Sequence, residues 1–187
     1  MQHQLERIIQ ELEHAEARLA ELERSVPGDR WSTRVDPDRW SVSECVVHLN
    51  LTSAAYIPRI RTAIEEAGKL PRSDGRKYRR DPAGWFLSTM IGPLPSIAGR
   101  RFGRVKTTAD FVPDGDQHPT VAVAAFKGCQ AELIALARDA DALAIDKVSI
   151  LSPFGNRMRY NCWSAFVILP RHQERHLQQA ETVWADE

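Results

Sequence analysis

The sequence has little cysteine, and its three cysteines form no recognisable pattern. Cys45, Cys129 and Cys162 lie far apart, with no C-x-x-C pair among them. An odd and scattered set argues against a disulfide framework and fits a reducing compartment. We therefore expect a cytoplasmic protein in which the three cysteines are small core residues.

An excess of charge of either sign is also missing. The chain has 25 basic and 25 acidic residues, so its global charge favours neither nucleic acid nor a membrane surface as a partner. No apolar run approaches the length that spans a bilayer, and the beginning of the chain lacks the basic-then-apolar pattern of a signal peptide. Internal repeats, low-complexity tracts and glycine-rich phosphate loops are absent too. We expect no nucleic-acid and no membrane partner, and a homodimer on base rate alone.

What the sequence does have is four long segments with apolar residues at helical spacing: 3–24, 41–67, 120–141 and 161–184. Ser41 and Glu44 form the S-x-x-E pattern of a capped helix start. A short helix is expected over 82–91, and extended or turn-like chain over 146–160. At 187 residues, the pattern predicts a single domain over 1–187 and an all-α fold. The expected fold is a four-helix bundle with a long crossover between its second and third helices.

Two histidines four residues apart, His172 and His176, stand in the last predicted helix. At this spacing both imidazoles project from one face, on a stripe with apolar residues above and below them. Neutral imidazole binds Zn, Ni, Cu and Fe, although a four-residue pair also arises by chance. The zinc-protease helix is excluded, because its general-base glutamate is replaced here by Gln173.

A third histidine, His48, lies on an inward stripe of helix 41–67. A lone inward histidine is more often a hydrogen-bonded core residue than a metal ligand. Pairing across a bundle with His172 and His176 strengthens the interpretation as a ligand. Glu44 lies one turn earlier, but its role in the helix cap is enough to explain it.

The crossover is the one strongly basic part of the chain. Residues 69–106 hold ten Lys and Arg against two Asp. Two interpretations stay open: a solvated surface, or a patch or lid that binds an anionic ligand. A nucleic-acid surface ranks last, because the segment lacks interleaved aromatic residues.

Three motifs occur in order along the chain and together resemble one family. Trp40-Ser41, Glu44 and His48-Leu49 read W-S-x-x-E-x-x-x-H-L. A short Ser-Pro-Phe-Gly turn follows at 152–155, and the third motif is His172-x-x-x-His176-Leu177 with Gln179. Over roughly residues 3–184 the chain resembles the DinB-like or YfiT-like metal-dependent enzymes, which are four-helix bundles.

The resemblance implies a divalent ion, nickel or zinc, held by His48, His172 and His176. Three imidazoles leave coordination positions open for water or substrate, as in catalytic zinc sites. Members of the wider family include transferases and isomerases that use low-molecular-weight thiols such as mycothiol, bacillithiol or glutathione, so we expect a small-molecule substrate and a thiol S-transferase. No catalytic side chain is assigned. Alternatives are a metal-dependent hydrolase and a non-enzymatic metal-binding module linked to stress.

A thiol cofactor of this kind carries carboxylates, which arginine binds with two parallel hydrogen bonds. The basic crossover supplies the candidates, and we expect at least one of its arginines to face the mouth of the metal site: Arg72, Arg76, Arg79, Arg80, Arg100 or Arg101. The candidate cofactor-binding residues are Arg79, Arg80, Arg100 and Arg101.

Overall fold

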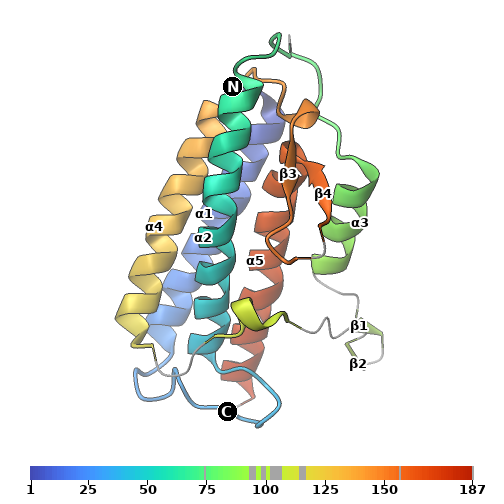
Figure 1. Cartoon of the computed structure of the whole chain (residues 1–187). Coiled ribbons are helices and arrows are strands. Elements are labelled where there is room, and N and C mark those ends of the chain that lie inside the picture. The colour runs from blue at the N-terminus through green and yellow to red at the C-terminus, as the bar shows by residue number, and fades with distance from the viewer. Residues whose placement is uncertain are drawn as a thin grey trace.

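Four long helices form a bundle in the computed structural model of the chain (Figure 1). They are α1 (His3–Ser25), α2 (Val42–Ala67), α4 (Pro119–Asp139) and α5 (Cys162–Ala185). The structure describes residues 1–73, 75–92, 96–97, 100–101, 107–113, 117–155 and 157–186, with backbone only for 96–97 and 100–101. The predicted all-α bundle is confirmed, and the four long helices agree with the predicted segments to within about two residues at each end.

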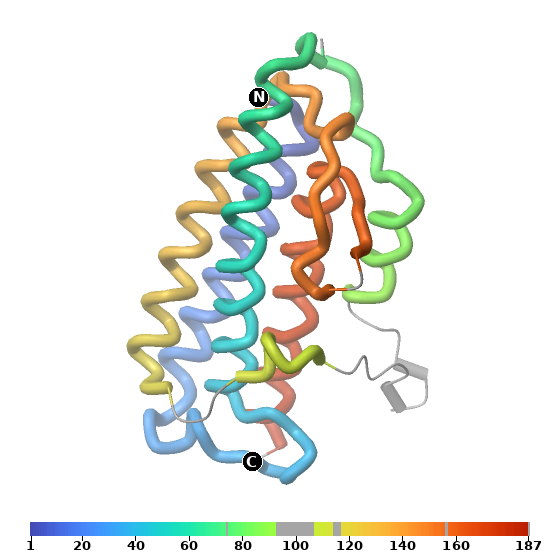
Figure 2. The backbone as a smooth tube through the Cα atoms, in the orientation of Figure 1, coloured from blue at the N-terminus to red at the C-terminus, as the bar shows by residue number. Residues whose placement is uncertain are grey.

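Helix direction decides which residues meet across the bundle. α2 packs against α4 and α5, and α1 packs against the same two helices, so α1 and α2 occupy opposite corners. α1 and α5 run toward one end of the bundle, whereas α2 and α4 run toward the other (Figure 2). The start of α2 therefore lies beside the second half of α5.

The long crossover follows α2 and returns along the outside of the bundle (Figure 1). It contains the predicted short helix, α3 (Pro82–Ile91), which packs against α5. The two-residue strands β1 (Ser96–Ile97) and β2 (Arg100–Arg101) pair with each other, and the short 3-10 helix η1 (Ala109–Phe111) contacts α2. The crossover thus leaves the far end of α2 and comes back to the end where α2 begins.

The connection from α4 to α5 contains a 3-10 turn, η2 (Ile145–Lys147), and a small antiparallel hairpin. Its strands are β3 (Ser149–Leu151) and β4 (Arg159–Asn161), in the region expected to be extended. Gly155 in the intervening turn has φ of 85°, a left-handed conformation that favours glycine. The turn places Phe154 beside Tyr56 of α2, with ring centroids 5.9 Å apart.

Side-chain caps fix the starts of α2, α3 and α5. The backbone N–H of Glu44 donates to Ser41 Oγ over 3.2 Å, and that of Ser41 donates to Glu44 Oε2 over 2.8 Å, which confirms the predicted capping box. Asp81 caps α3 through Gly84 N and also accepts from the backbone N–H of Asn161, each over 2.7 Å. Asn161 caps α5 by accepting from Ser164 N over 2.9 Å. α3 and α5 therefore begin at one shared junction.

Two apolar clusters fill the bundle, one toward each end. A buried amide pair lies at the level between them: Gln173 Nε2 donates to Gln130 Oε1 over 2.7 Å, and Gln130 Nε2 donates to the Leu12 carbonyl over 2.7 Å. This network joins α1, α4 and α5. It satisfies buried amides that would otherwise cost free energy.

α4 corrects one expectation from the sequence. By length and composition alone, this helix is apolar enough to cross a membrane, which the search for long apolar runs did not predict. Its residues Ala122, Phe126 and Leu133 are fully buried, and the helix packs on α1 and α2. Packing within the bundle accounts for the apolar stripe of α4.

Two glycine-to-alanine substitutions should have opposite effects on stability. A Cβ at Gly84 would lie 2.0 Å from Ser164 Oγ, whereas a Cβ at Gly128 in α4 would meet nothing within 4 Å. We expect Gly84→Ala to lower the free energy of unfolding by about 1–3 kcal/mol through overpacking. Gly128→Ala should raise it by about 0.5–1 kcal/mol, because alanine favours the helix. Urea unfolding measures both, and a Gly84→Ala protein as stable as wild type would contradict the tight junction.

Candidate metal centre

Three histidines from two antiparallel helices converge in the bundle. His48 lies in the second turn of α2, and His172 and His176 lie one turn apart in α5. One nitrogen of each can be chosen so that all three lie within 4.8 Å of one another. The ring centroids are 4.5 Å apart for His48 and His176, 4.6 Å for His172 and His176, and 5.0 Å for His48 and His172. This group is able to hold a metal ion.

The orientation of the His48 ring follows from one hydrogen bond. Its Nδ1 lies 2.7 Å from the carbonyl oxygen of Phe111 in η1. A carbonyl only accepts, so Nδ1 carries the proton and Nε2 keeps its lone pair. That Nε2 lies 3.2 Å from His172 Nε2 and faces the centre of the group. A backbone carbonyl holding one ring nitrogen, with the other directed inward, is the usual arrangement of a metal-binding histidine.

His172 and His176 leave buried polar atoms without partners. The Nδ1 atoms of both rings are buried and have no hydrogen-bond partner among the described residues. The residues themselves are only 6% and 9% exposed. A buried polar atom without a partner costs free energy. Two of the three clustered imidazoles therefore keep an unpaired buried nitrogen, which fits a ligand-binding site better than a closed core.

The protein environment keeps these imidazoles neutral. Burial lowers the pKa of His176 to about 3, and the neighbouring His48 ring and the positive charge of Arg175 lower it further. Burial and the other two histidines hold the pKa of His172 well below its usual value. Burial also lowers the pKa of His48, although its bond to Phe111 opposes the effect. Neutral imidazoles have lone pairs to offer a metal at neutral pH.

Aromatic rings enclose the histidines. The Trp40 ring lies 4.9 Å from that of His48 and is stacked 5.8 Å from that of His176. Phe154, from the Ser-Pro-Phe-Gly turn, lies 6.0 Å from His172. Trp40 from the first sequence motif and Phe154 from the second therefore form apolar walls around the three histidines.

A hollow of about 330 Å³ opens above the three histidines. We call it the histidine hollow. Apolar side chains dominate its lining: Phe86, Leu87, Met90 and Ile91 from α3, with Phe154 and Met158 from the hairpin turn. Arg175 of α5 is the cationic side chain among the described lining residues. The volume is at the lower end of the range for small-molecule sites.

The other residues singled out in the sequence lie elsewhere. Glu44 caps α2 and forms an ion pair with Arg34, which outweighs the effect of burial and lowers the pKa of Glu44. Gln173 faces Gln130 of α4 and not the histidines. Arg79 and Arg80 line a different hollow, and Arg72 and Arg76 do not line the histidine hollow either. The expectation that at least one of the six arginines stands at its mouth therefore rests on Arg100 and Arg101.

The remaining two predicted cofactor-binding residues, Arg100 and Arg101, form β2. Their side chains lie outside what the structure describes, so their role stays a prediction.

Sequence reasoning missed three contributors to the site. Trp40 was noted only as part of the helix start, although the motif places it eight residues before His48. Arg175 had a visible signal, since it directly precedes His176 on the same helix. Phe111 had none, because any residue type offers a backbone carbonyl and only the folded crossover brings this one to His48.

Residues 11–180 match the DinB superfamily. The chain belongs to the DinB superfamily. The match spans all four bundle helices and includes His48, His172 and His176. No curated protein and no solved structure matches the chain. This DinB protein thus has the fold expected from its motifs, together with a buried three-histidine group able to hold a metal.

The lowered histidine pKa values predict how stability depends on pH in the metal-free protein. Above the unfolded pKa of about 6.5 the histidines are neutral in both states. Below it the unfolded chain binds protons that the folded chain does not. The free energy of unfolding should therefore decrease as the pH is lowered below about 6.5. The decrease is about 1.4 kcal/mol per pH unit for each such histidine. For His176 this window ends at its folded pKa of about 3.

The measurement is urea unfolding of the metal-free wild type and of His176→Gln, from about pH 7 to about pH 5. The variant should lose less stability over this range, by about 1.4 kcal/mol per pH unit. Taking the difference cancels the acid effects shared by both proteins. Parallel curves would contradict a neutral, buried His176.

Proposed function

We propose that this DinB protein is a metal-dependent enzyme that transfers a low-molecular-weight thiol to an electrophile. The observation that carries the proposal is the group of three buried, neutral imidazoles beneath a largely apolar hollow. His48, His172 and His176 would hold a divalent ion, nickel or zinc. When bound, such an ion supplies positive charge that lowers the pKa of a nearby thiol, so that thiolate is present at neutral pH.

The proposal needs a thiol from outside the chain. Burial raises the pKa of the Cys162 thiol to about 12 and also raises that of Cys45. Both residues are buried, and Cys129 lies half-buried on α4. None of the three lines the histidine hollow. A small-molecule thiol of the mycothiol, bacillithiol or glutathione type is therefore the nucleophile we propose.

The lining of the hollow indicates how the two substrates are bound. Phe86 and Met90 offer apolar surface at its rim, with exposed fractions of 55% and 39%. An apolar electrophile would cover this surface and exclude water from the reacting thiol. Arg175 lines the same hollow and would bind a carboxylate of the thiol. In this role Arg175 replaces Arg79 and Arg80, which line another hollow.

Hydrolysis is the second candidate, and the same lining disfavours it. A water-activating site needs a general base within hydrogen-bond reach of the water. Among the described residues that line the histidine hollow there is no aspartate or glutamate. Glu44, the carboxylate nearest in sequence to His48, is paired with Arg34.

Metal content and fold can be separated by one set of measurements. Protein purified without a histidine tag should contain about one divalent ion per chain, and His172→Ala should weaken its binding by more than roughly hundredfold. Circular dichroism should show that both the chelated protein and His172→Ala remain folded at room temperature, because two apolar clusters fill the bundle. Unfolding on chelation would instead make the ion structural and favour a non-enzymatic metal-binding module.

Thiol transfer can be tested directly on the nickel- and zinc-loaded protein. Consumption of mycothiol, bacillithiol and glutathione is followed with an aryl electrophile, and one thiol should be consumed above the metal-free control. His48→Ala should abolish turnover. Phe86→Ala should raise KM for the electrophile by roughly tenfold, the effect of losing one buried aromatic contact.

The matched control is Leu151→Ala on β3, an exposed apolar residue away from the histidine hollow, which should leave KM unchanged. Thiols left unconsumed, together with a water-dependent cleavage of ester or amide probes, would replace transfer with hydrolysis.

A further inference from the structure

A second hollow, of about 590 Å³, lies between α1, α3 and α5. We call it the arginine hollow. α5 contributes Trp163 and Arg171 to it, whereas the adjacent His172 lines the histidine hollow. α3 is shared in the same way, with Trp85 on the arginine hollow and Phe86 on the histidine hollow. The two hollows have no described lining residue in common, so the arginine hollow is a separate site.

Four arginines from three parts of the chain line the arginine hollow. They are Arg7 of α1, Arg79 and Arg80 of the crossover, and Arg171 of α5. Glu11 is the one carboxylate among the described lining residues, and its Oε1 pairs with Arg7 Nε over 3.0 Å. The positive charge of this hollow therefore greatly exceeds the negative charge, although the whole chain is neutral.

Most of the hydrogen-bonding capacity of these guanidinium groups remains available. Arg80 donates one bond to Ser88 Oγ over 2.7 Å, and Arg171 Nε donates one to the Ser88 carbonyl over 2.8 Å. A guanidinium has five N–H donors, so both keep several. In the part of the chain that the structure describes, the Arg79 side chain has no hydrogen bond or ion pair, and it is exposed. Arg79 is thus the donor most available to a ligand.

Aromatic rings supply flat apolar surface in the same hollow. Trp163 is only 5% exposed and packs against Tyr78, with ring centroids 5.2 Å apart. Trp85 stands at the rim and is 56% exposed, a large apolar surface to leave in water. A planar ligand would cover Trp85 and gain stacking as well as apolar burial.

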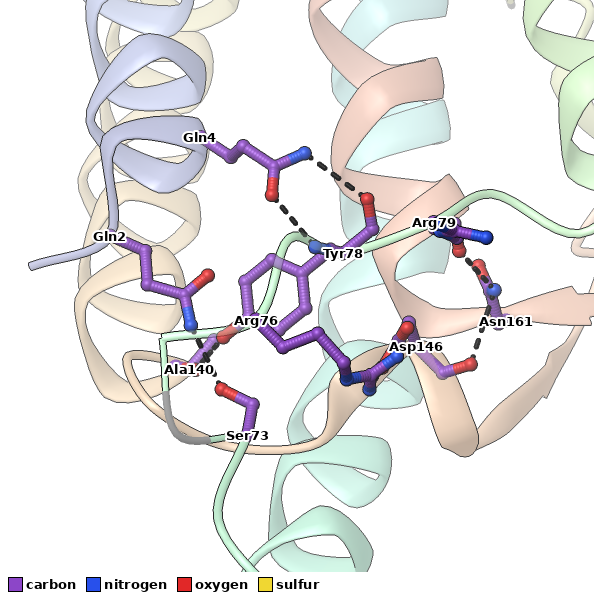
Figure 3. A network of polar contacts seen from close by, with 9 residues as sticks. All are labelled: Gln2, Gln4, Ser73, Arg76, Tyr78, Arg79, Ala140, Asp146 and Asn161. Carbon is purple, nitrogen blue, oxygen red and sulfur yellow. Dashed lines mark hydrogen bonds and ion pairs between the residues drawn. The ribbon is translucent and has the colours of Figure 1, made fainter.

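Hydrogen bonds to its backbone hold the segment that carries Arg79 in place (Figure 3). Tyr78 N donates to Gln4 Oε1 over 2.7 Å, and Gln4 Nε2 donates to the Tyr78 carbonyl over 3.2 Å. The Arg79 carbonyl accepts from Asn161 Nδ2 over 2.8 Å. These bonds tie the crossover to α1 and α5 and leave the Arg79 guanidinium unengaged. The backbone at Arg79 is therefore fixed before any ligand binds, so only the side chain has to be ordered on binding.

We propose that the arginine hollow binds a small anionic molecule that carries a planar aromatic ring. The carboxylate or phosphate of this ligand would pair with Arg79 and with the spare donors of Arg80 and Arg171, in the bidentate geometry that guanidinium favours. Its ring would lie against Trp85. The inference does not depend on a metal or on thiol transfer, because none of these residues lines the histidine hollow.

The test is calorimetric titration of the full chain with 2-naphthoate, which has both a ring and a carboxylate. Neutral 2-naphthamide lacks the charge, and acetate lacks the ring. We expect 2-naphthoate to bind more tightly than either. Arg79→Ala and Trp85→Ala should each weaken its binding by roughly tenfold. These two side chains hold no other element in place, so both variants should stay folded. Weaker binding of 2-naphthoate then reports the loss of the contact itself.

Two control variants decide where the probe binds. Arg61→Ala removes an exposed arginine of α2, which is paired with Glu132, and should leave 2-naphthoate binding unchanged. Phe86→Ala alters only the histidine hollow and should do the same. The proposal is overturned if no binding occurs, if Arg61→Ala weakens binding as much as Arg79→Ala, or if Phe86→Ala weakens it while Trp85→Ala does not. Equal binding of 2-naphthoate and 2-naphthamide would also overturn it.

Discussion

The burial of three imidazole rings against one another is the constraint on which the site depends. Such a group is stable only if the rings stay neutral, because several positive charges in this small volume would repel one another and lack water. The protein meets this condition by enclosing the rings between Trp40 and Phe154 and by lowering their pKa values. What it leaves unmet is the hydrogen bonding of two Nδ1 atoms. Two unpaired buried nitrogens lower the stability of a core, so their presence fits a metal site better than a group with a purely structural role.

The polar network beside this group keeps the rest of the bundle closed. Gln173 is adjacent to His172 in sequence, yet it faces α4, and both polar atoms of its amide pair with Gln130. One face of α5 therefore carries a buried amide that is paired, and the neighbouring face carries two buried histidine nitrogens that are not. This contrast within a single helix turn locates the function of α5 on its histidine face.

The crossover is more than a connection between α2 and α4. Through η1 it supplies the carbonyl that orients His48, and through α3 it supplies apolar walls for the histidine hollow. Its segment before α3 positions Arg79 and Arg80 over a different hollow. The basic charge that stood out in the sequence is thus in part separate from the histidines. The two hollows are therefore separate candidate sites, and the crossover contributes to both.

The sequence by itself determined the elements of the fold. Apolar spacing located the four long helices, and the Ser41 and Glu44 pattern located the start of α2, because helix periodicity and capping are local properties of the chain. The three motifs and their order identified the family and the three histidines. α4 contains no single long apolar run, yet by length and composition it is apolar enough to cross a membrane.

Contacts between distant residues could not be predicted from local patterns. The antiparallel run of α2 and α5 brings His48 to His172 and His176, and no local pattern encodes helix direction in space. The same holds for the Phe111 carbonyl, for Trp40 against His176, and for Arg175 in place of Arg79 at the histidine hollow. Charge in the sequence shows that a segment is basic, but the path of the backbone decides which hollow receives it. Contacts between distant segments follow from packing of the whole chain, so they are fixed only when the bundle is complete.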